Sequence, residues 1–446
     1  MHGDHRARFA AWIAAIALAV VASAGDAAER RIDRAAYAEK LEGFWLGQCI
    51  GNWTGLVTEM DKIGGNGPHG RFYTWDDWGG PDQPAIWGDG QPSRLSPTID
   101  FVFADADSVW GADDDTDIEY MYQHLLLVHE TSVLTGEQIR DGWLRHTYAA
   151  DETPFRDADG NPENFLWVSN QRARDLMADE GLVPPHTSDP ARNPHVDMID
   201  AQLTTEIFGL LAPGRPDVAL GMARLPILTT ARGDARAAAE FYVVMHSLAA
   251  VVDPDASPRE QVLRLARRAR PRLPEGSYVA SMYDFVHGKY TAGVLWEDVR
   301  DELHRKYQVR QEDGYDISAR GLWCNGCFAS GINFGASLIS LFYGEGDLRR
   351  TIRIATLAGW DSDNPAATWG GLLGFLLGRS GVEAEFGRTF SVRFDIHRTR
   401  RGFPIDGHDS FGAMAARGCR IVDRVVREEM GGRVDVGRGE WIVPMR

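Results

Sequence analysis

The chain has 446 residues, 44% of them hydrophobic and 25% charged, which is typical of a folded globular protein and argues against disorder. Its formal net charge of −17 argues against a general nucleic-acid binder, because such proteins neutralise phosphates with lysine and arginine. An acidic surplus instead suits a protein that binds divalent cations, which prefer oxygen ligands.

Residues 1–24 have the layout of a signal peptide. Arg6 and Arg8 precede an apolar run at residues 9–22, and small residues suited to cleavage follow it. The run is too short to span a bilayer comfortably, since a spanning helix needs about 20 apolar residues. We therefore expect cleavage, no stable membrane insertion afterwards and a periplasmic or secreted protein. An uncleaved anchor is the alternative.

Apolar residues at intervals of three and four predict helices over most of the remaining chain. The clearest helical segments are residues 34–50, 117–129, 235–252, 258–268 and 347–357. Strand-like alternation is confined mainly to the C-terminal part, in SVRFDIH from Ser391 and in RVDV and EWIV near the end. We expect a single domain, residues 30–446, with an all-α body and a small C-terminal β appendage.

A long loop, residues 64–96, separates the first two helical segments. Loops of this length inside compact domains are usually functional or disordered. This one is too aromatic for a disordered linker, because it contains Phe72, Tyr73, Trp75, Trp78 and Trp87. The tyrosine and the tryptophans could stack on a sugar or base, or they could pack the loop onto the body.

Two series of small residues recur every four positions, which places each series along one face of a helix. The first series is Gly43, Gly47, Gly51 and Gly55, and the next step of four is Glu59. The second follows Asp361 and Asp363 and comprises Ala366, Gly370, Gly374 and Gly378. Each glycine inside a helix costs about 1 kcal/mol relative to alanine, so close packing must offset it.

Two such glycine ridges can pack on each other, and their acidic ends would then converge. A membrane dimer of the GxxxG type is the alternative, but Glu42, Gln48 and Asn52 interrupt the first ridge.

A third acidic group, Asp113, Asp114 and Asp115, stands with Thr116 before an apolar helical run. A helix start needs one or two capping side chains, and three adjacent carboxylates near two more would repel unless a cation neutralised them. A solvated acidic helix start is the alternative. Together with Asp361 and Asp363 these residues offer oxygen ligands without histidine or cysteine, which favours Mg²⁺, Mn²⁺ or Ca²⁺ over zinc. We expect two divalent cations, Mg²⁺ first among them.

Cys324 and Cys327, in CNGC, could pair in an oxidising compartment or could be two small buried residues. A zinc site would need two further ligands at suitable spacing, and none appears.

Three segments together resemble the ADP-ribosylglycohydrolase family: GFWLGQCIGNWTGLVTE, the Asp-rich run at 113–116, and GWDSDNPAATWGGLLG. The segment IDAQLTTEIFGLLAPG from Ile199 is also similar to exported members. Asn52 stands where the family usually has aspartate, Asp113 replaces a hydroxyl residue, and Thr230 and Ala231 stand where related proteins tend to have a histidine. The resemblance implies an all-α, multi-helix orthogonal bundle and a dinuclear metal centre. Its ligands would be Asp113, Asp114, Asp115, Asp361, Asp363 and Asn364.

The implied chemistry is hydrolysis of an N- or O-glycosidic bond through an oxocarbenium-like state. Glu59 would act as acid/base or gating carboxylate, or would only support the metal ligands, with Asp115 as the second catalytic candidate. Trp167, Trp360 and Asn52 are candidate substrate contacts, and a place in the core is the alternative for Trp360. The substrate would be a small ADP-ribosyl compound, nucleoside or other glycoside, bound by a monomer. A non-catalytic carbohydrate- or nucleotide-binding protein on the same fold is the alternative. A serine hydrolase lacks support, because no GxSxG motif occurs.

Overall fold

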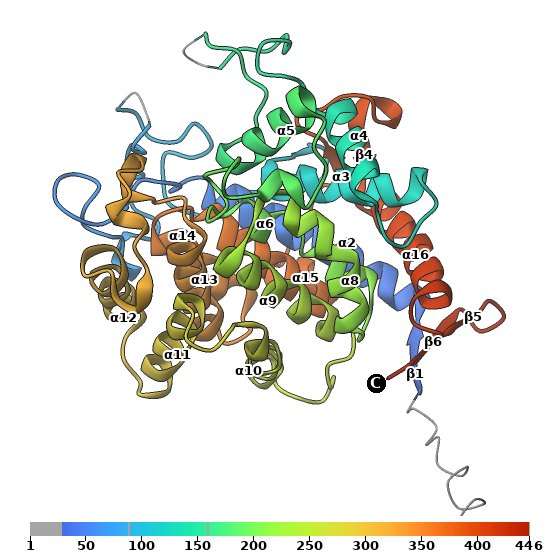
Figure 1. Ribbon diagram of the computed structural model, residues 1–446. Helices are drawn as coiled ribbons and strands as arrows, with labels where there is room; N and C mark the ends of the chain where they lie inside the picture. Colours follow the sequence, from blue (N-terminus) through green and yellow to red (C-terminus); the bar gives the residue numbers. More distant parts are fainter. Residues whose placement is uncertain (1–28, 88–89, 158–159, 446) are drawn as a thin grey trace, which may run out of the picture.

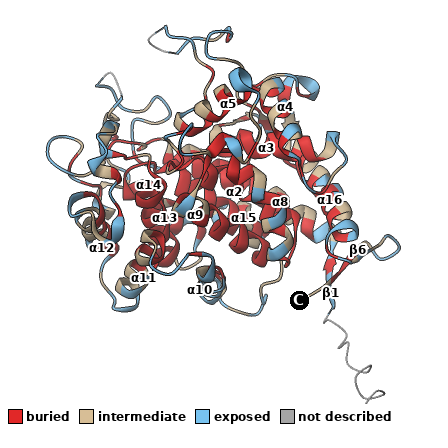
Figure 2. Cartoon of the chain, viewed as in Figure 1, coloured by how far each residue is buried: buried red, intermediate tan, exposed pale blue. Residues whose placement is uncertain are grey.

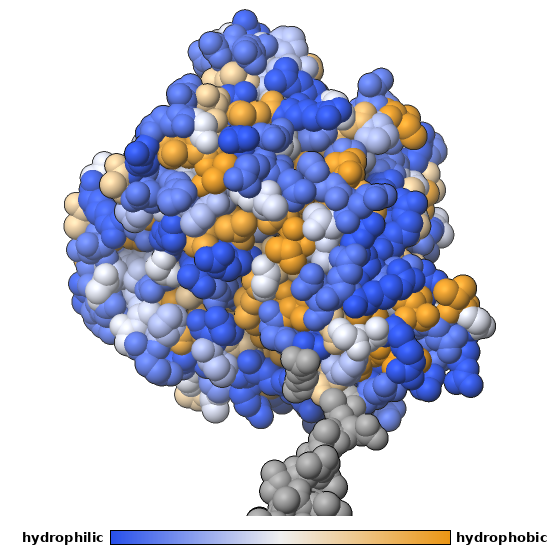
Figure 3. Space-filling model, turned by 45° about the vertical axis from the view of Figure 1, so that its right-hand side comes forward, coloured by the Kyte–Doolittle hydropathy of each residue, from blue (hydrophilic) through white to orange (hydrophobic). Residues whose placement is uncertain are grey.

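The computed structural model describes residues 29–87, 90–157 and 160–445 (Figure 1). The predicted signal peptide, residues 1–24, lies outside the described residues. Within them, no helix is both long and apolar enough to cross a bilayer. Figure 3 shows one face on which polar and charged residues surround scattered apolar patches.

Two long helices, α2 (Arg34–Gly55) and α15 (Asp363–Phe386), pack along each other in the middle of the molecule. Two mostly or fully buried helices, α9 (Gly233–Ala249) and α13 (Ser330–Gly344), lie beside them, and Figure 2 shows this interior group in red. The remaining longer helices surround this group, and most of them carry exposed residues along one face. They are α3 (Asp114–Val128), α4 (Gly136–His146), α5 (Val168–Glu180), α8 (Pro216–Thr230), α10 (Pro258–Ala269), α11 (Tyr278–Thr291), α12 (Trp296–Leu303), α14 (Leu348–Ala358) and α16 (Phe411–Glu428).

These helices confirm the all-α prediction, and each of the five predicted helical segments lies on an observed helix. The largest shift is at the end of α2, which continues to Gly55 where the prediction ended at residue 50. Helix α3 begins at Asp114, so Asp114 and Asp115 form part of its first turn and do not merely precede it. Two short buried helices, α6 (Asp200–Leu203) and α7 (Ile207–Leu211), come from the IDAQLTTEIFGLL segment.

The strands of the described residues form two small sheets. In the first, β6 (Glu440–Pro444) pairs antiparallel with both β1 (Glu29–Asp33) and β5 (Arg433–Asp435), with Ile32 opposite Trp441. In the second, β3 (Arg393–Asp395) lies parallel to β2 (Trp110–Gly111) and antiparallel to β4 (His408–Ser410). The predicted C-terminal β appendage is therefore present, and each sheet takes in one strand from the N-terminal part of the chain.

The two glycine ridges face each other, as predicted. A β-carbon on Gly43 would lie 2.6 Å from the carbonyl carbon of Gly378, and one on Gly55 would lie 2.7 Å from the backbone nitrogen of Asp363. Real β-carbons do not approach other atoms this closely, so the helices reach this separation only because side chains are absent. Gly378 has φ +72°, a conformation that suits glycine, and it kinks α15 at the end of the ridge.

Candidate active site

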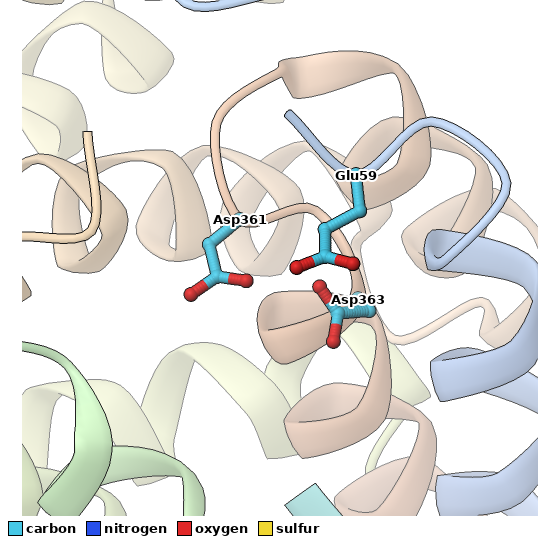
Figure 4. A group of neighbouring side chains, drawn as sticks. All are labelled: Glu59, Asp361 and Asp363. Atoms are coloured by element: carbon cyan, nitrogen blue, oxygen red, sulfur yellow. The ribbon is translucent and has the colours of Figure 1, made fainter. Parts of the chain in front are cut away.

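The register of α2 against α15 brings the first acidic group together. Glu59 follows the C-terminal end of α2, while Asp361 and Asp363 stand at the N-terminal end of α15. Each of the three offers a carboxylate oxygen that lies within 4.8 Å of the others. Figure 4 shows their carboxylates gathered around one space. Asp361 and Asp363 are buried, and Glu59 is half-buried.

Asp113, Asp114 and Asp115 form the second group, at the start of α3, and their carboxylate oxygens also lie within 4.8 Å of one another. The hydroxyl of Thr116 accepts a hydrogen bond from the backbone N–H of Asp113 at 3.0 Å. The Asp113 side chain in turn faces the backbone N–H of Thr116, so Asp113 and Thr116 form a capping box at the start of α3. The Asn52 side-chain amide donates to the Asp113 carboxylate at 3.1 Å, which links this group to α2.

The two groups act on each other electrostatically. Burial raises the pKa of Asp115 well above its ordinary value, and the negative charges of Asp363 and Asp114 raise it further. Burial likewise raises the pKa of Glu59, with Asp363 and Asp361 adding to the effect. The six carboxyl groups therefore occupy one site in which negative charge is unfavourable unless protons or cations balance it.

A chain of three polar side chains holds Asp115 in place. The amide of Asn364 donates to the Asp115 carboxylate at 3.2 Å, and its own oxygen accepts from Gln202 at 3.3 Å. Gln202 in turn accepts from the hydroxyl of Ser330 at 2.9 Å, at the first turn of α13. The structure thus uses both ends of the Asn364 amide in hydrogen bonds, and its role as a metal ligand stays a prediction.

The oxygens of this site fit hard divalent cations. Asp115 Oδ2, Asp363 Oδ1 and Asn52 Oδ1 are buried without a hydrogen-bond partner. A buried carboxylate oxygen without a partner is costly, and a cation would satisfy it. Carboxylate and amide oxygens without histidine or cysteine match Mg²⁺, Mn²⁺ or Ca²⁺.

Sequence reasoning missed Asp200 and Arg400, because both reach the site from distant segments. Asp200, on α6, is buried and accepts a hydrogen bond from the Asn170 backbone N–H at 2.9 Å. Burial is the main cause of the raised pKa of Asp114 and Asp361, and the charge of Asp200 adds to it. Arg400 forms a buried ion pair with Asp117 of α3 at 2.8 Å. The resemblance of the segment from Ile199 was the only signal for Asp200. Arg400 had none.

The three candidate substrate contacts lie in different surroundings. Trp360 is fully buried, its ring N–H donates to Gln308 at 2.9 Å, and Phe72 packs against it, so it belongs to the core and offers no surface to a ligand. Its burial favours the alternative for Trp360, a place in the core. Asn52 is also fully buried and contacts Asp113, whereas Trp167 is 54% exposed. Contact between either residue and a substrate stays a prediction.

The aromatic residues of the loop at residues 64–96 also differ in how far they are buried. Tyr73 is buried and donates to the Asp61 carboxylate at 2.7 Å. Trp75 and Trp78 each lie 4.8 Å from the guanidinium of Arg353, which packs the loop onto α14. Trp87 differs from them, because it is 47% exposed.

Cys324 and Cys327 of the CNGC motif form a disulfide, so they are not simply two small buried residues. Cys49 and Cys419 are free and buried.

Comparison with known proteins identifies the class to which this protein belongs. Residues 33–399 match the model of the ADP-ribosylglycohydrolase family, so this chain belongs to that family, as its motifs predicted. Membership supports a hydrolase-like function. A solved structure described as an ADP-ribosylglycohydrolase-related protein complex aligns with 87% of this chain and 99% of its own, at 15% identity and a TM-score of 0.43. No curated protein matches the chain.

Proposed function

We propose that this protein is a divalent-metal-dependent glycosidase that hydrolyses an N- or O-glycosidic bond. Its substrate would be an ADP-ribosyl compound, a nucleoside or another small glycoside. One observation carries the proposal: two groups of three carboxylates meet in one largely buried site, where oxygens of Asp115 and Asp363 have no hydrogen-bond partner. Such a site is built to hold cations, and family membership supports hydrolysis.

Two divalent cations, Mg²⁺ in the first place and otherwise Mn²⁺ or Ca²⁺, would be held by the carboxylates of the two groups, with Asn364 as the amide candidate. When bound, such ions stabilise developing negative charge and activate water for attack. The chain's own residues then have to orient the sugar and move protons.

Glu59 is suited to proton transfer. It is half-buried, whereas Asp361 and Asp363 beside it are buried, so it is the most accessible carboxylate of its group. It would donate a proton to the leaving group or accept one from water, as carboxyl groups do in glycosidases. Asp115, held by Asn364, would provide a fixed negative charge facing the oxocarbenium-like state.

The proposed location is periplasmic or secreted. The signal-like segment at residues 1–24 supports it, and so does the Cys324–Cys327 disulfide, because disulfides persist mainly in oxidising compartments. The net charge of −17 would disfavour polyphosphate substrates and favour uncharged or singly charged glycosides.

The test is metal content by mass spectrometry, together with thermal unfolding in Mg²⁺, Mn²⁺ or Ca²⁺. We expect about two ions per chain. A divalent cation at ~100 times its dissociation constant should stabilise the folded state by about 2.7 kcal/mol. Asp361→Asn and Asp115→Asn should lose this stabilisation and the activity while staying folded. Asp179→Asn, on the exposed end of α5, is the matched control. Full metal stoichiometry in both site variants would contradict the proposal.

A non-catalytic binding protein is the second candidate. The Asn52 amide is engaged with an oxygen of Asp113, at two positions where this chain departs from the family pattern. Metal binding with no hydrolysis of ADP-ribose conjugates, nucleosides or aryl glycosides would favour this alternative.

A further inference from the structure

Three aromatic rings pack against one another at the surface, and we call them the aromatic platform: Trp87, Trp323 and Phe328. The rings of Trp87 and Phe328 are 5.8 Å apart and within 5° of parallel. Trp323 lies 5.5 Å from Phe328 with planes 23° apart. Trp87 is 47% exposed and Trp323 is 58% exposed, so two large indole rings remain partly in water.

Hydrogen bonds tie the platform to the two segments that carry the first acidic group. The backbone N–H of Ile86, next to Trp87, donates to the carbonyl of Met60, next to Glu59, at 3.1 Å. On the other side, Asn333 accepts from the backbone N–H of Asp361 at 3.2 Å and donates to the Cys327 carbonyl at 2.8 Å. The segments that carry Trp87 and Phe328, 241 positions apart in the sequence, are therefore both tied to the segments that carry the first acidic group.

The turn that presents Trp323 and Phe328 is held in several ways. The Cys324–Cys327 disulfide closes it between the two rings. The Phe328 carbonyl accepts from the backbone N–H of Ile199 at 3.1 Å, one residue before Asp200. Surfaces held in the binding conformation lose little entropy when a ligand arrives, so this turn is well prepared to bind.

We propose that the aromatic platform binds the leaving group of the substrate, and that this leaving group is a planar aromatic ring system of nucleobase size. This inference rests on the proposed glycosidase function. A planar aromatic ligand can stack on an exposed indole face whatever substituents its ring carries. An aliphatic alcohol gains little binding energy from the same surface. The adjoining acidic site would hold the sugar, so the two surfaces together match an aryl glycoside or nucleoside.

Binding of free adenine, which has no sugar and no scissile bond, tests the platform alone. Saturation-transfer difference NMR would compare the wild type with Trp87→Ala, Trp323→Ala and Trp323→Phe. We expect about tenfold weaker binding for each alanine variant and an intermediate loss for Trp323→Phe, which keeps a planar ring. Asp361→Asn should bind adenine as the wild type does. Ile405→Ala, at an exposed apolar residue elsewhere, is the control. Equal binding in all variants, or no binding to the wild type, would overturn the proposal.

Kinetics then connect the platform with hydrolysis. With one sugar and two leaving groups, 4-nitrophenyl and methyl, Trp87→Ala and Trp323→Ala should raise KM about tenfold for the aryl glycoside and change it less than twofold for the methyl glycoside. An equal loss for both would also overturn the assignment. If adenine binding depends on the tryptophans but no glycoside is hydrolysed, the platform stands and the glycosidase proposal fails.

Discussion

The backbones of Gly47 and Gly370 touch across the interface of α2 and α15. A β-carbon on Gly47 would lie 2.9 Å from the carbonyl carbon of Gly370, and one on Gly370 would lie 3.1 Å from that of Gly47. Each would lie closer still to the facing carbonyl oxygen. This contact sets the separation of the two helices, and the helices set the positions of Glu59, Asp361 and Asp363.

Gly47→Ala should therefore destabilise the protein, although alanine is the better helix former. Backbone cannot move aside as a flexible side chain can, so we expect a loss of about 3 kcal/mol in the free energy of unfolding, measured in urea. Gly221→Ala is the matched control, because Gly221 lies in α8 and its β-carbon would meet nothing within 4 Å. That variant should gain up to ~1 kcal/mol. Similar effects of the two substitutions would contradict the close packing.

Gln202→Met should weaken the binding of divalent cations without unfolding the protein. Gln202 orients Asn364, which orients Asp115, and removal of such supporting hydrogen bonds typically costs about 10- to 100-fold in metal affinity. Isothermal titration calorimetry with Mn²⁺ would measure the change. Ser330→Ala removes only the donor to Gln202 and should have a smaller effect. Unchanged affinity in Gln202→Met would show that Asp115 needs no such support.

Arg400→Met should destabilise the fold by removing the partner of a buried charge. Arg400 and Asp117 have side chains that are 1% and 0% exposed, and breaking a buried pair of this kind costs about 3–5 kcal/mol. Arg400 also donates to the carbonyls of Asn164 and Phe165, which precede Trp167. Adding Asp117→Asn should recover part of the loss in denaturant unfolding. No recovery in the double variant would mean that these carbonyl contacts, not the ion pair, matter.

His246 should make stability depend on pH. Burial lowers its pKa from 6.5 to about 4, so the unfolded chain binds this proton more tightly than the folded one. The stability that His246 contributes is present above pH 6.5 and is lost as pH falls toward 4, by about 2 kcal/mol at pH 5. His246→Asn removes this dependence. Its destabilisation, measured in urea, should be larger at pH 7.5 than at pH 5, and a constant difference would contradict the assignment.

Several features of the site were readable in the sequence because they are local and periodic. Glycines at every fourth position define one face of a helix, and Glu59 falls at the next step of the same spacing. The interval between Asp361 and Asp363 likewise places both at the start of α15. Burial of such a ridge requires a complementary ridge, so the pairing of α2 with α15 followed from the two patterns together.

Other parts of the site depend on contacts between distant segments, which no local pattern records. Gln202 reaches Asn364 across 162 positions, and Arg400 reaches Asp117 across 283. The aromatic platform needs Trp87 and Phe328 to meet, and the burial of Trp360 depends on Phe72 and Gln308 packing around it. The sequence by itself determined the helices, the small-residue faces and the acidic character of the site. Only the tertiary structure decided which side chains support the carboxylates and which tryptophans stay exposed, because packing between distant segments sets burial and hydrogen bonding.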